Sequence, residues 1–367
     1  MPMEEQLCRI ALTLVPGIGD VLGKKLITHC GSAEAVFREK KKFLTRIPRV
    51  GEKLAEALSG TDAFLRAEKE LVFMERYQIR PLFFRDREYP FRLKNCYDSP
   101  VILYWKGNAD LNASRILGMV GTRKATEYGK TVCQRLIAGL SDPPVLIVSG
   151  LAYGIDSCAH RACLESGLPT IGVLGHGLDR IYPGFHRVMA EKMIRQGGLL
   201  TEFPSGTMPD RENFPKRNRI IAGMCDGIVV VEAGTKGGAL ITAEIANSYN
   251  RDVFAVPGRI GDPWSEGANA LIRNNKAALI QSVEDIRYLM GWDAPPDRPA
   301  PKQKKIFIEM TPEEEVLVKI LEETGRTGVD ELCIRAGISM SRVSAALLNL
   351  EFEGVVRSLP GKCYELC

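Results

Sequence analysis

The sequence predicts an α/β protein built on a doubly wound, largely parallel sheet, with a small helical domain before it and another small domain after it. Three observations lead to this prediction. Short apolar segments alternate with helical patterns between residues 115 and 290. A pair of Gly-containing repeats precedes this region, and a pattern of helices closed by a β-hairpin follows it.

Composition limits the class of protein. The chain has 367 residues, 45% of them hydrophobic, which is enough for two or three domains with their own cores. It has no apolar run of about 18 residues, and its N-terminus lacks the basic and apolar regions of a signal peptide, so we expect a cytoplasmic protein with no membrane segment. The net charge of +4 is too small to identify a polyanionic partner. Local clusters of charge must do that.

The ten cysteines are scattered and include no C-x-x-C pair. Cys158, His160 and Cys163 share a predicted helix but lack the spacing of a metal site. We therefore expect reduced, structural thiols, with no metal and no cofactor.

Residues 1–80 are predicted to form an all-α domain with an internal repeat. Residues 15–20 (VPGIGD) and 47–52 (IPRVGE) both resemble the helix-hairpin-helix pattern, in which a Gly-containing hairpin presents backbone amides to a nucleic-acid phosphate. Arg49 replaces Gly17 in the second copy, which leaves the conformation of that hairpin open. Residues 38–53 are strongly basic, and they are either a DNA-contacting surface or a solvated face of a domain that only packs or mediates contacts.

Between the helical domain and the sheet, a helix is predicted over residues 63–77. Residues 81–114 are predicted to be an extended connector with short apolar strands, residues 101–105 among them.

The central domain, residues 115–290, carries the strands that define the fold class. Right-handed crossovers between successive strands would make the sheet largely parallel. Ligands of such sheets bind beyond the carboxyl ends of the strands, so the residues that follow each strand are candidates for binding. Apolar segments predict strands at 116–120, 145–148, 170–174, 198–201, 227–231, 253–256 and 278–280.

The segments that follow these strands are rich in glycine and in basic residues. Glycines let backbone amides approach phosphates, and each Lys or Arg neutralises one phosphate, so this edge suits a track of phosphates better than one mononucleotide. The candidate binding residues are Gly121, Thr122, Arg123, Ser149, Gly150, Tyr153, Gly154, Phe214, Lys216, Arg217, Asn218, Arg219, Lys236, Gly237, Gly238 and Asn269.

The first of these segments predicts an anion site. A buried strand, a tight turn at Gly121, Thr122 and Arg123, and a helix N-terminus follow one another, and Arg123 adds donors suited to phosphate oxygens. A dinucleotide site is disfavoured because the turn lacks G-x-G-x-x-G and because Ser149, rather than an acidic residue, follows the second strand. An ATP-binding P-loop is disfavoured because Lys124 stands where an earlier glycine is required.

Residues 213–219 (NFPKRNR) combine more basic and aromatic side chains than the other segments that follow the strands. They are predicted to open a helix at 220–224, so that backbone amides and three cations face one ligand. Aromatic side chains are available to stack bases, namely Phe214, Tyr153 and Tyr182. The alternative is that some arginines hold loops in place through salt bridges with Asp156, Glu202 or Glu232.

The last part of the chain is predicted to be a linker followed by a winged helix. Residues 291–310 are rich in Pro and Lys and are predicted to be a flexible linker. Residues 311–367 show helical patterns at 316–323, 329–336 and 341–352 and a two-stranded wing at 355–366. Only Arg342 is strongly basic in the third helix, so this domain either reads DNA or binds another protein.

The motifs of the central domain, taken together, resemble the DNA-processing protein A family of bacteria, known as DprA or Smf. They are VGTR at 120–123, SGLAYGID at 149–156 with AH at 159–160, FPKRNRIIA at 214–222, the segment from EA at 232–233 to TA at 242–243, VPG at 256–258 and EGAN at 266–269. There are two departures from the family pattern. Gly237 and Gly238 stand where Ser-Gly is usual, and Cys158 and Cys163 stand where small residues are usual.

The resemblance implies an extended Rossmann-like domain that binds single-stranded DNA, forms homodimers and helps to load the RecA recombinase during DNA uptake, natural transformation and recombination. It also implies that Arg123, Lys216, Arg217 and Arg219 contact phosphates. The helix-hairpin-helix-like and winged-helix domains fit the same family.

Two main hypotheses follow. The first is a non-catalytic protein that binds single-stranded DNA, protects incoming DNA and loads RecA; His160 and His176 are then hydrogen-bonding residues, because no nucleophile accompanies them. The alternative is a nucleotide phosphoribohydrolase-like enzyme on a related fold, because residues 234–238 with Glu244 are similar to its P-G-G-x-G-T-x-x-E loop. The altered order of Gly and Thr, and the lack of a placed acid–base pair, disfavour the enzyme. A recruitment scaffold that depends on the terminal domains is a third possibility.

Overall fold

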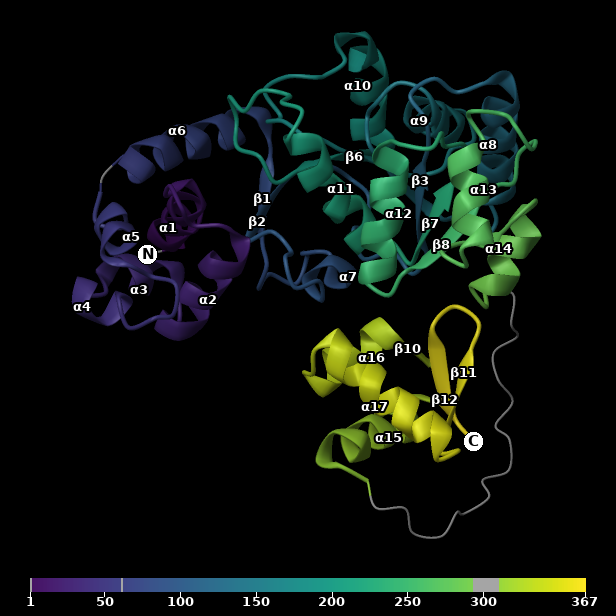
Figure 1. Ribbon diagram of the computed structural model, residues 1–367. Helices are drawn as coiled ribbons and strands as arrows, with labels where there is room; N and C mark the ends of the chain where they lie inside the picture. The colour runs from purple at the N-terminus through teal and green to yellow at the C-terminus, as the bar shows by residue number, and fades with distance from the viewer. Residues whose placement is uncertain (1, 61, 293–309) are drawn as a thin grey trace.

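The structure is a computed structural model that describes residues 2–60, 62–292 and 310–367. Its centre is a nine-stranded sheet, with the N-terminal helices beside it and the C-terminal domain below it in Figure 1. The strand order is β1-β2-β6-β5-β4-β3-β7-β8-β9. These strands are β1 (Arg80–Phe83), β2 (Ile102–Gly107), β3 (Ile116–Val120), β4 (Leu146–Ser149), β5 (Thr170–Val173), β6 (Gly197–Thr201), β7 (Gly227–Val230), β8 (Asp252–Ala255) and β9 (Ala278–Leu279).

The predicted doubly wound fold is confirmed. Each strand predicted between residues 115 and 290 is present within one or two residues, and from β6 to β9 every neighbouring pair is parallel. The chain adds strands outward from β3 to β6 and then restarts on the other side with β7, so the order reverses between β3 and β7. Ligands of such sheets bind near this reversal.

The segment predicted as a connector differs from expectation in one respect. Its strands β1 and β2 join the central sheet, where β2 pairs antiparallel with β6. A sequence pattern identifies a strand but not its partner, because pairing depends on residues far away in the chain.

Helices cover both faces of the sheet. Ile116 and Val120 of β3 pack toward one set of helices, and Leu117 and Met119 pack toward the other, as alternation along a strand requires. The first set is α7 (Phe91–Lys94), α11 (Asn213–Met224), α12 (Gly238–Ser248) and α13 (Glu266–Arg273). The second set is α8 (Glu127–Gly139), α9 (Ile155–Glu165), α10 (Arg187–Gln196) and α14 (Val283–Leu289).

The N-terminal domain is all helical up to β1, as predicted. Its elements are α1 (Pro2–Leu14), α2 (Asp20–Cys30), α3 (Ala33–Arg38), α4 (Lys41–Leu44), α5 (Glu52–Ala57) and α6 (Asp62–Tyr77). The two hairpins share one conformation. The N–H of Ile18 donates to Val15 O at 3.1 Å, and the N–H of Val50 donates to Ile47 O at 3.0 Å. Arg49 adopts φ +77° where Gly17 has φ +88°, at a cost of roughly 1–2 kcal/mol for a residue with a side chain.

Two contacts fasten the helical domain to the carboxyl side of the sheet. Asp20 at the start of α2 pairs with Arg219 of α11 at 2.9 Å. The carboxylate of Glu70 on α6 accepts hydrogen bonds from the backbone N–H and hydroxyl of Ser205, in the loop before α11. The helical domain therefore adjoins the edge that the sequence predicts to be the binding edge.

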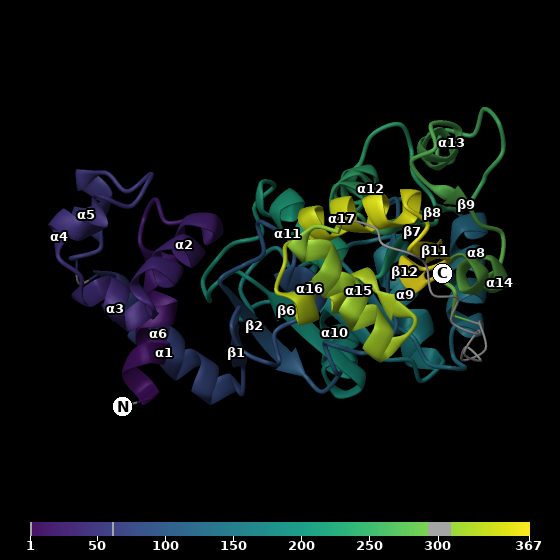
Figure 2. The same ribbon diagram turned by 90° about the horizontal axis from the view of Figure 1, so that it is seen from below.

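The C-terminal domain is a winged helix, as predicted. Its elements are α15 (Pro312–Thr324), β10 (Thr327–Gly328), α16 (Val329–Ala336), α17 (Met340–Phe352), β11 (Val356–Leu359) and β12 (Cys363–Leu366). It docks on the amino ends of the strands, where Asp330 pairs with Arg251, the residue before β8. The predicted linker lies outside the described residues except at its ends. Figure 2 shows the three domains from below.

Arg342 in α17 forms an ion pair with Glu313, so the basic side chain of the predicted groove-reading helix is neutralised. Within the described ranges, no helix has the length and apolar character needed to cross a membrane, and no cluster of His, Cys, Asp or Glu could hold a metal ion.

Candidate nucleic-acid interface

Three loops pack tightly at the carboxyl ends of β3, β4 and β7. The N–H of Thr122 donates to Glu232 O at 2.7 Å, and the N–H of Ile155 donates to Thr122 O at 3.2 Å. Gly154 has φ +82°, and a Cβ there would lie 2.1 Å from Thr122 O. Only glycine allows this approach, so Gly154 positions the turn that carries Arg123.

The helix N-terminus after this turn is not free for a phosphate, which corrects the sequence-based expectation. The carboxylate of Glu232 accepts hydrogen bonds from the backbone N–H of Thr126, at 2.9 Å, and from its hydroxyl. Thr126 caps α8, so an acidic side chain of the protein occupies the positive end of that helix. Glu232 thus pairs with a helix terminus rather than with an arginine.

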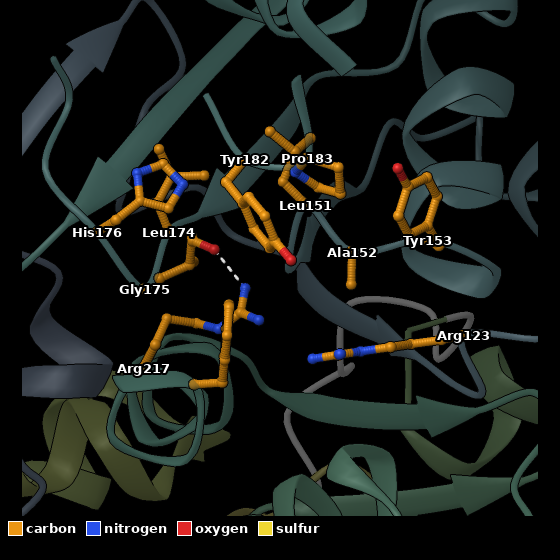
Figure 3. Close-up of a pocket in the computed structure, with 12 residues that line it drawn as sticks. Arg123, Leu151, Ala152, Tyr153, Leu174, Gly175, His176, Tyr182, Pro183 and Arg217 are labelled. Atoms are coloured by element: carbon orange, nitrogen blue, oxygen red, sulfur yellow. Dashed lines mark hydrogen bonds between the residues drawn. The ribbon is translucent and has the colours of Figure 1, made fainter. Parts of the chain in front are cut away.

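A small hollow lies beside these loops. Figure 3 shows Arg123 and Arg217 pointing into it from opposite sides, with Tyr153 and Tyr182 at its rim. Its volume of about 40 Å³ holds roughly three water molecules, and the guanidinium groups of Arg123 and Arg217 are suited to phosphate oxygens there. Tyr153 and Tyr182 are about half exposed, so their rings are accessible for stacking.

Arg217 is the buried cation of this hollow. Its guanidinium donates to the carbonyl of Val173 at the end of β5, and a Cβ on Gly150 would lie 2.3 Å from its Nη1 atom. Burial lowers the pKa of Arg217 to about 10, and the neighbouring Asp156 acts in the opposite direction, so the side chain stays charged at neutral pH. Burial raises the pKa of Asp156, and Arg217 opposes this rise. Gly150 therefore makes room for a buried charge pair.

Arg123 and Lys216 are the exposed cations. The Arg123 guanidinium lies 5.3 Å from the ring centroid of Phe214. Among the residues that the structure describes, neither cation has an acidic partner within ion-pair distance. They are available to a ligand.

The expectation that three cations of residues 213–219 face one ligand is corrected. The helix starts at Asn213 rather than Ile220, so Lys216, Arg217 and Arg219 lie inside it and project in different directions. Arg219 points toward the helical domain and pairs with Asp20 and Glu202. The alternative interpretation, in which an arginine holds a loop in place, therefore describes the contacts of Arg219.

Several other candidate residues have structural hydrogen bonds. The Ser149 hydroxyl donates to Met119 O at 2.6 Å, and the Asn218 amide donates to Gly238 O at 3.3 Å. The Asn269 amide both donates to and accepts from the backbone of Gly258. Lys236 and Gly237 are exposed in the loop after β7, outside the hollow.

Both histidines considered as catalysts are buried. Burial lowers the pKa of His160 to about 4, and its ring nitrogens contact Gly150 O and the Thr170 hydroxyl. Burial also lowers the pKa of His176, whose Nδ1 lies 2.9 Å from Gly177 O. Hydrogen bonds to the backbone of Gly177 and Tyr182 oppose this lowering.

The candidate residues predicted from the sequence make up only part of the lining of the hollow. Leu151, Ala152, Val173, Leu174, Gly175, His176 and Pro183 also line the hollow. Most follow β4 or β5, so the strand-end rule located them, but no pattern of residue types selected them individually.

Comparison with known proteins agrees with this architecture. A family described as DNA recombination-mediator protein A matches residues 80–291. A SAM-like helix-hairpin-helix tandem matches residues 10–59, and a DprA winged helix domain matches residues 294–362. These matches confirm the predicted flanking domains.

Individual relatives extend the match to the whole chain. The chain is 33% identical to Protein Smf of Synechocystis sp., over the full length of both proteins. The X-ray structure of DNA processing protein A from Streptococcus pneumoniae superposes with a TM-score of 0.66 and 31% identity, covering 77% of this chain and 96% of that one. A DNA processing protein A structure from Helicobacter pylori, described for its single-stranded DNA binding mode, has a TM-score of 0.52 and 27% identity, covering 57% and 94%.

Proposed function

The chain belongs to the DNA recombination-mediator protein A family, and from this premise we propose that it is a non-catalytic protein that binds single-stranded DNA at the carboxyl edge of its sheet. Bound there, the strand is protected and delivered to the RecA recombinase during natural transformation and recombination. The protein acts in the cytoplasm as a homodimer.

One observation carries the proposal. Arg123 and Arg217 point into a hollow that is rimmed by exposed aromatic rings, and Lys216 lies exposed on the same helix as Arg217. Arg123 and Lys216, which have no acidic partner within ion-pair distance in the described part of the chain, attract a polyanion, whereas Asp156 offsets part of the charge of Arg217. Aromatic rings stack bases of any sequence. The single-stranded DNA binding mode described for the Helicobacter pylori relative supports the same ligand.

A double variant tests the proposal. Arg123→Ala with Lys216→Ala should abolish tight binding of oligo-dT and lower the salt dependence of log K by roughly 1.4, at about 0.7 for each lost contact to a single strand. Fluorescence anisotropy across a salt series measures both quantities. An affinity that stays within a factor of about two of wild type would place the DNA elsewhere. Random oligonucleotides should bind about as well as oligo-dT, because cations and amides contact the backbone rather than the bases.

The enzyme alternative has a separate test. Glu244, the acidic residue that it requires, is exposed on α12 and pairs with Lys276 at 2.6 Å. We expect no free base when the protein is incubated with nucleoside monophosphates. Steady release of base by catalytic amounts of protein would replace the proposed function with hydrolysis.

A further inference from the structure

A second hollow lies between α9 and α10, on the side of the central domain. These helices pack against each other, as Figure 1 shows near the top of the view. The groove has a volume of about 670 Å³, far larger than the first hollow. Its lining includes Arg161 and Glu165 of α9, Phe185, and Lys192 and Arg195 of α10. None of these residues is among the candidate binding residues predicted from the sequence.

The charge of the groove is positive. Arg161, Lys192 and Arg195 are exposed, and none of them has an acidic partner within ion-pair distance in the described part of the chain. Arg187 at the start of α10 is exposed as well. The acidic side chains on these helices that reach the surface nearby are Glu165 and Glu191. The cations therefore outnumber the carboxylates, and a polyanion is the complementary ligand.

A series of rings joins the groove to the first hollow. Tyr153, which lines the first hollow, lies 5.1 Å from His186 between ring centroids, and His186 lies 6.0 Å from Phe185. His186 and Phe185 both line the groove. Phe185 is 80% exposed, so its ring is accessible to a base that lies between the two hollows.

The groove runs away from the binding edge. α10 begins after the loop that follows β5 and ends where β6 starts, so it descends from the carboxyl edge of the sheet to the amino edge. Ten helical residues span about 15 Å, which leaves room for further nucleotides beyond the first hollow. Cations and an exposed aromatic ring spaced along such a path are the features that hold a single strand.

We propose that the single strand leaves the first hollow across Phe185 and continues along the groove between α9 and α10, where Arg161, Lys192 and Arg195 bind its phosphates. This inference rests on the proposed function, because the strand enters the groove from the first hollow. It extends the binding site of one subunit to a surface outside the carboxyl edge.

A length series separates the two sites. The triple variant Arg161→Gln, Lys192→Gln and Arg195→Gln should bind the shortest oligo-dT of a series from about 4 to about 16 nucleotides as wild type does. It should bind the longest roughly tenfold more weakly, with the salt dependence of log K lowered by about 2, at about 0.7 for each of three cations. Phe185→Ala should weaken only the longer oligonucleotides.

The matched control removes the same charge elsewhere. Lys69→Gln, Arg135→Gln and Lys319→Gln change exposed cations of α6, α8 and α15 and should leave every length unaffected. If the groove triple variant binds the longest oligo-dT like the control, the inference is overturned, and an acidic protein surface becomes the better ligand for the groove. If wild type binds no oligonucleotide of any length, the proposed function itself is contradicted, and not only the role of the groove.

Discussion

Neighbouring residues of α11 have opposite environments. Lys216 is exposed, whereas Arg217 is buried beside Asp156 and donates a hydrogen bond to the carbonyl oxygen of Val173. A helix turns by about 100° per residue, so adjacent side chains cannot share one environment. The chemical similarity of Lys and Arg therefore says little about their roles here, and burial decides which of them supports the fold.

The contrast predicts that substitution of Arg217 lowers the stability of the fold, whereas substitution of Lys216 lowers the affinity for DNA. Arg217→Met leaves the buried Asp156 without its counter-charge and should lower the free energy of unfolding by roughly 3 kcal/mol. Lys216→Met should change that free energy by less than about 0.5 kcal/mol yet weaken binding of single-stranded DNA. Urea denaturation and anisotropy on both variants measure these two effects. Equal stability of the two variants would contradict the prediction.

At the scale of elements, a charge cluster links α2 to α11. Glu202, in the loop after β6, and Asp20 share the guanidinium of Arg219. Burial raises the pKa of Glu202 from 4.5 to about 7, although Arg219 acts in the opposite direction. The cluster therefore joins two domains at a site where one carboxyl group titrates near neutral pH.

The raised pKa predicts a pH dependence. Protonated Glu202 favours the folded state, so its contribution is complete below pH 4.5 and is lost as the pH rises through about 7. Glu202→Gln should thus gain stability relative to wild type between pH 5 and pH 8, by up to roughly 3 kcal/mol. His160, with a lowered pKa, contributes in the opposite direction, but it is present in both proteins and cancels in the difference.

Chemical denaturation at several pH values measures this difference. The control is Glu191→Gln, which changes an exposed carboxyl group on α10 and should follow wild type throughout. A Glu202→Gln stability difference that stays constant from pH 5 to pH 8 would show that Glu202 does not titrate in this range.

At the scale of the whole molecule, the two flanking domains attach to opposite edges of the sheet. The helical domain joins the carboxyl edge through Asp20 and Glu70, beside the proposed DNA site. The winged helix joins the amino edge through Asp330 and Lys362. The winged helix is therefore separated by the depth of the sheet from the hollow that holds Arg123.

This arrangement predicts that docking of the winged helix and DNA binding are independent. Asp330→Ala leaves the buried Arg251 unpaired and should weaken docking by roughly 3 kcal/mol, seen as faster release of the winged helix in limited proteolysis. The affinity for oligo-dT should stay within a factor of about two. Lys362→Ala, which removes a partly exposed pair at 3.8 Å, is the control and should change proteolysis little. A large loss of DNA affinity in Asp330→Ala would mean that the winged helix belongs to the site.

The sequence by itself determined the order of strands and helices, the doubly wound class and the edge at which the candidate binding residues gather. These features follow from patterns within a few residues, such as the apolar strand at Ile116–Val120 and the turn that follows it. The conformation of the second hairpin is also set by nearby residues, because it matches that of the first hairpin even with Arg49 in place of glycine.

Only the tertiary structure decided which charged groups are free to bind. Arg219 is held by Asp20, which is distant in the sequence, and the start of α8 is capped by Glu232 from another loop. The groove cations of α9 and α10 come together only because the two helices pack. Ion pairing and burial depend on which segments meet in space, and a local pattern contains no information on that.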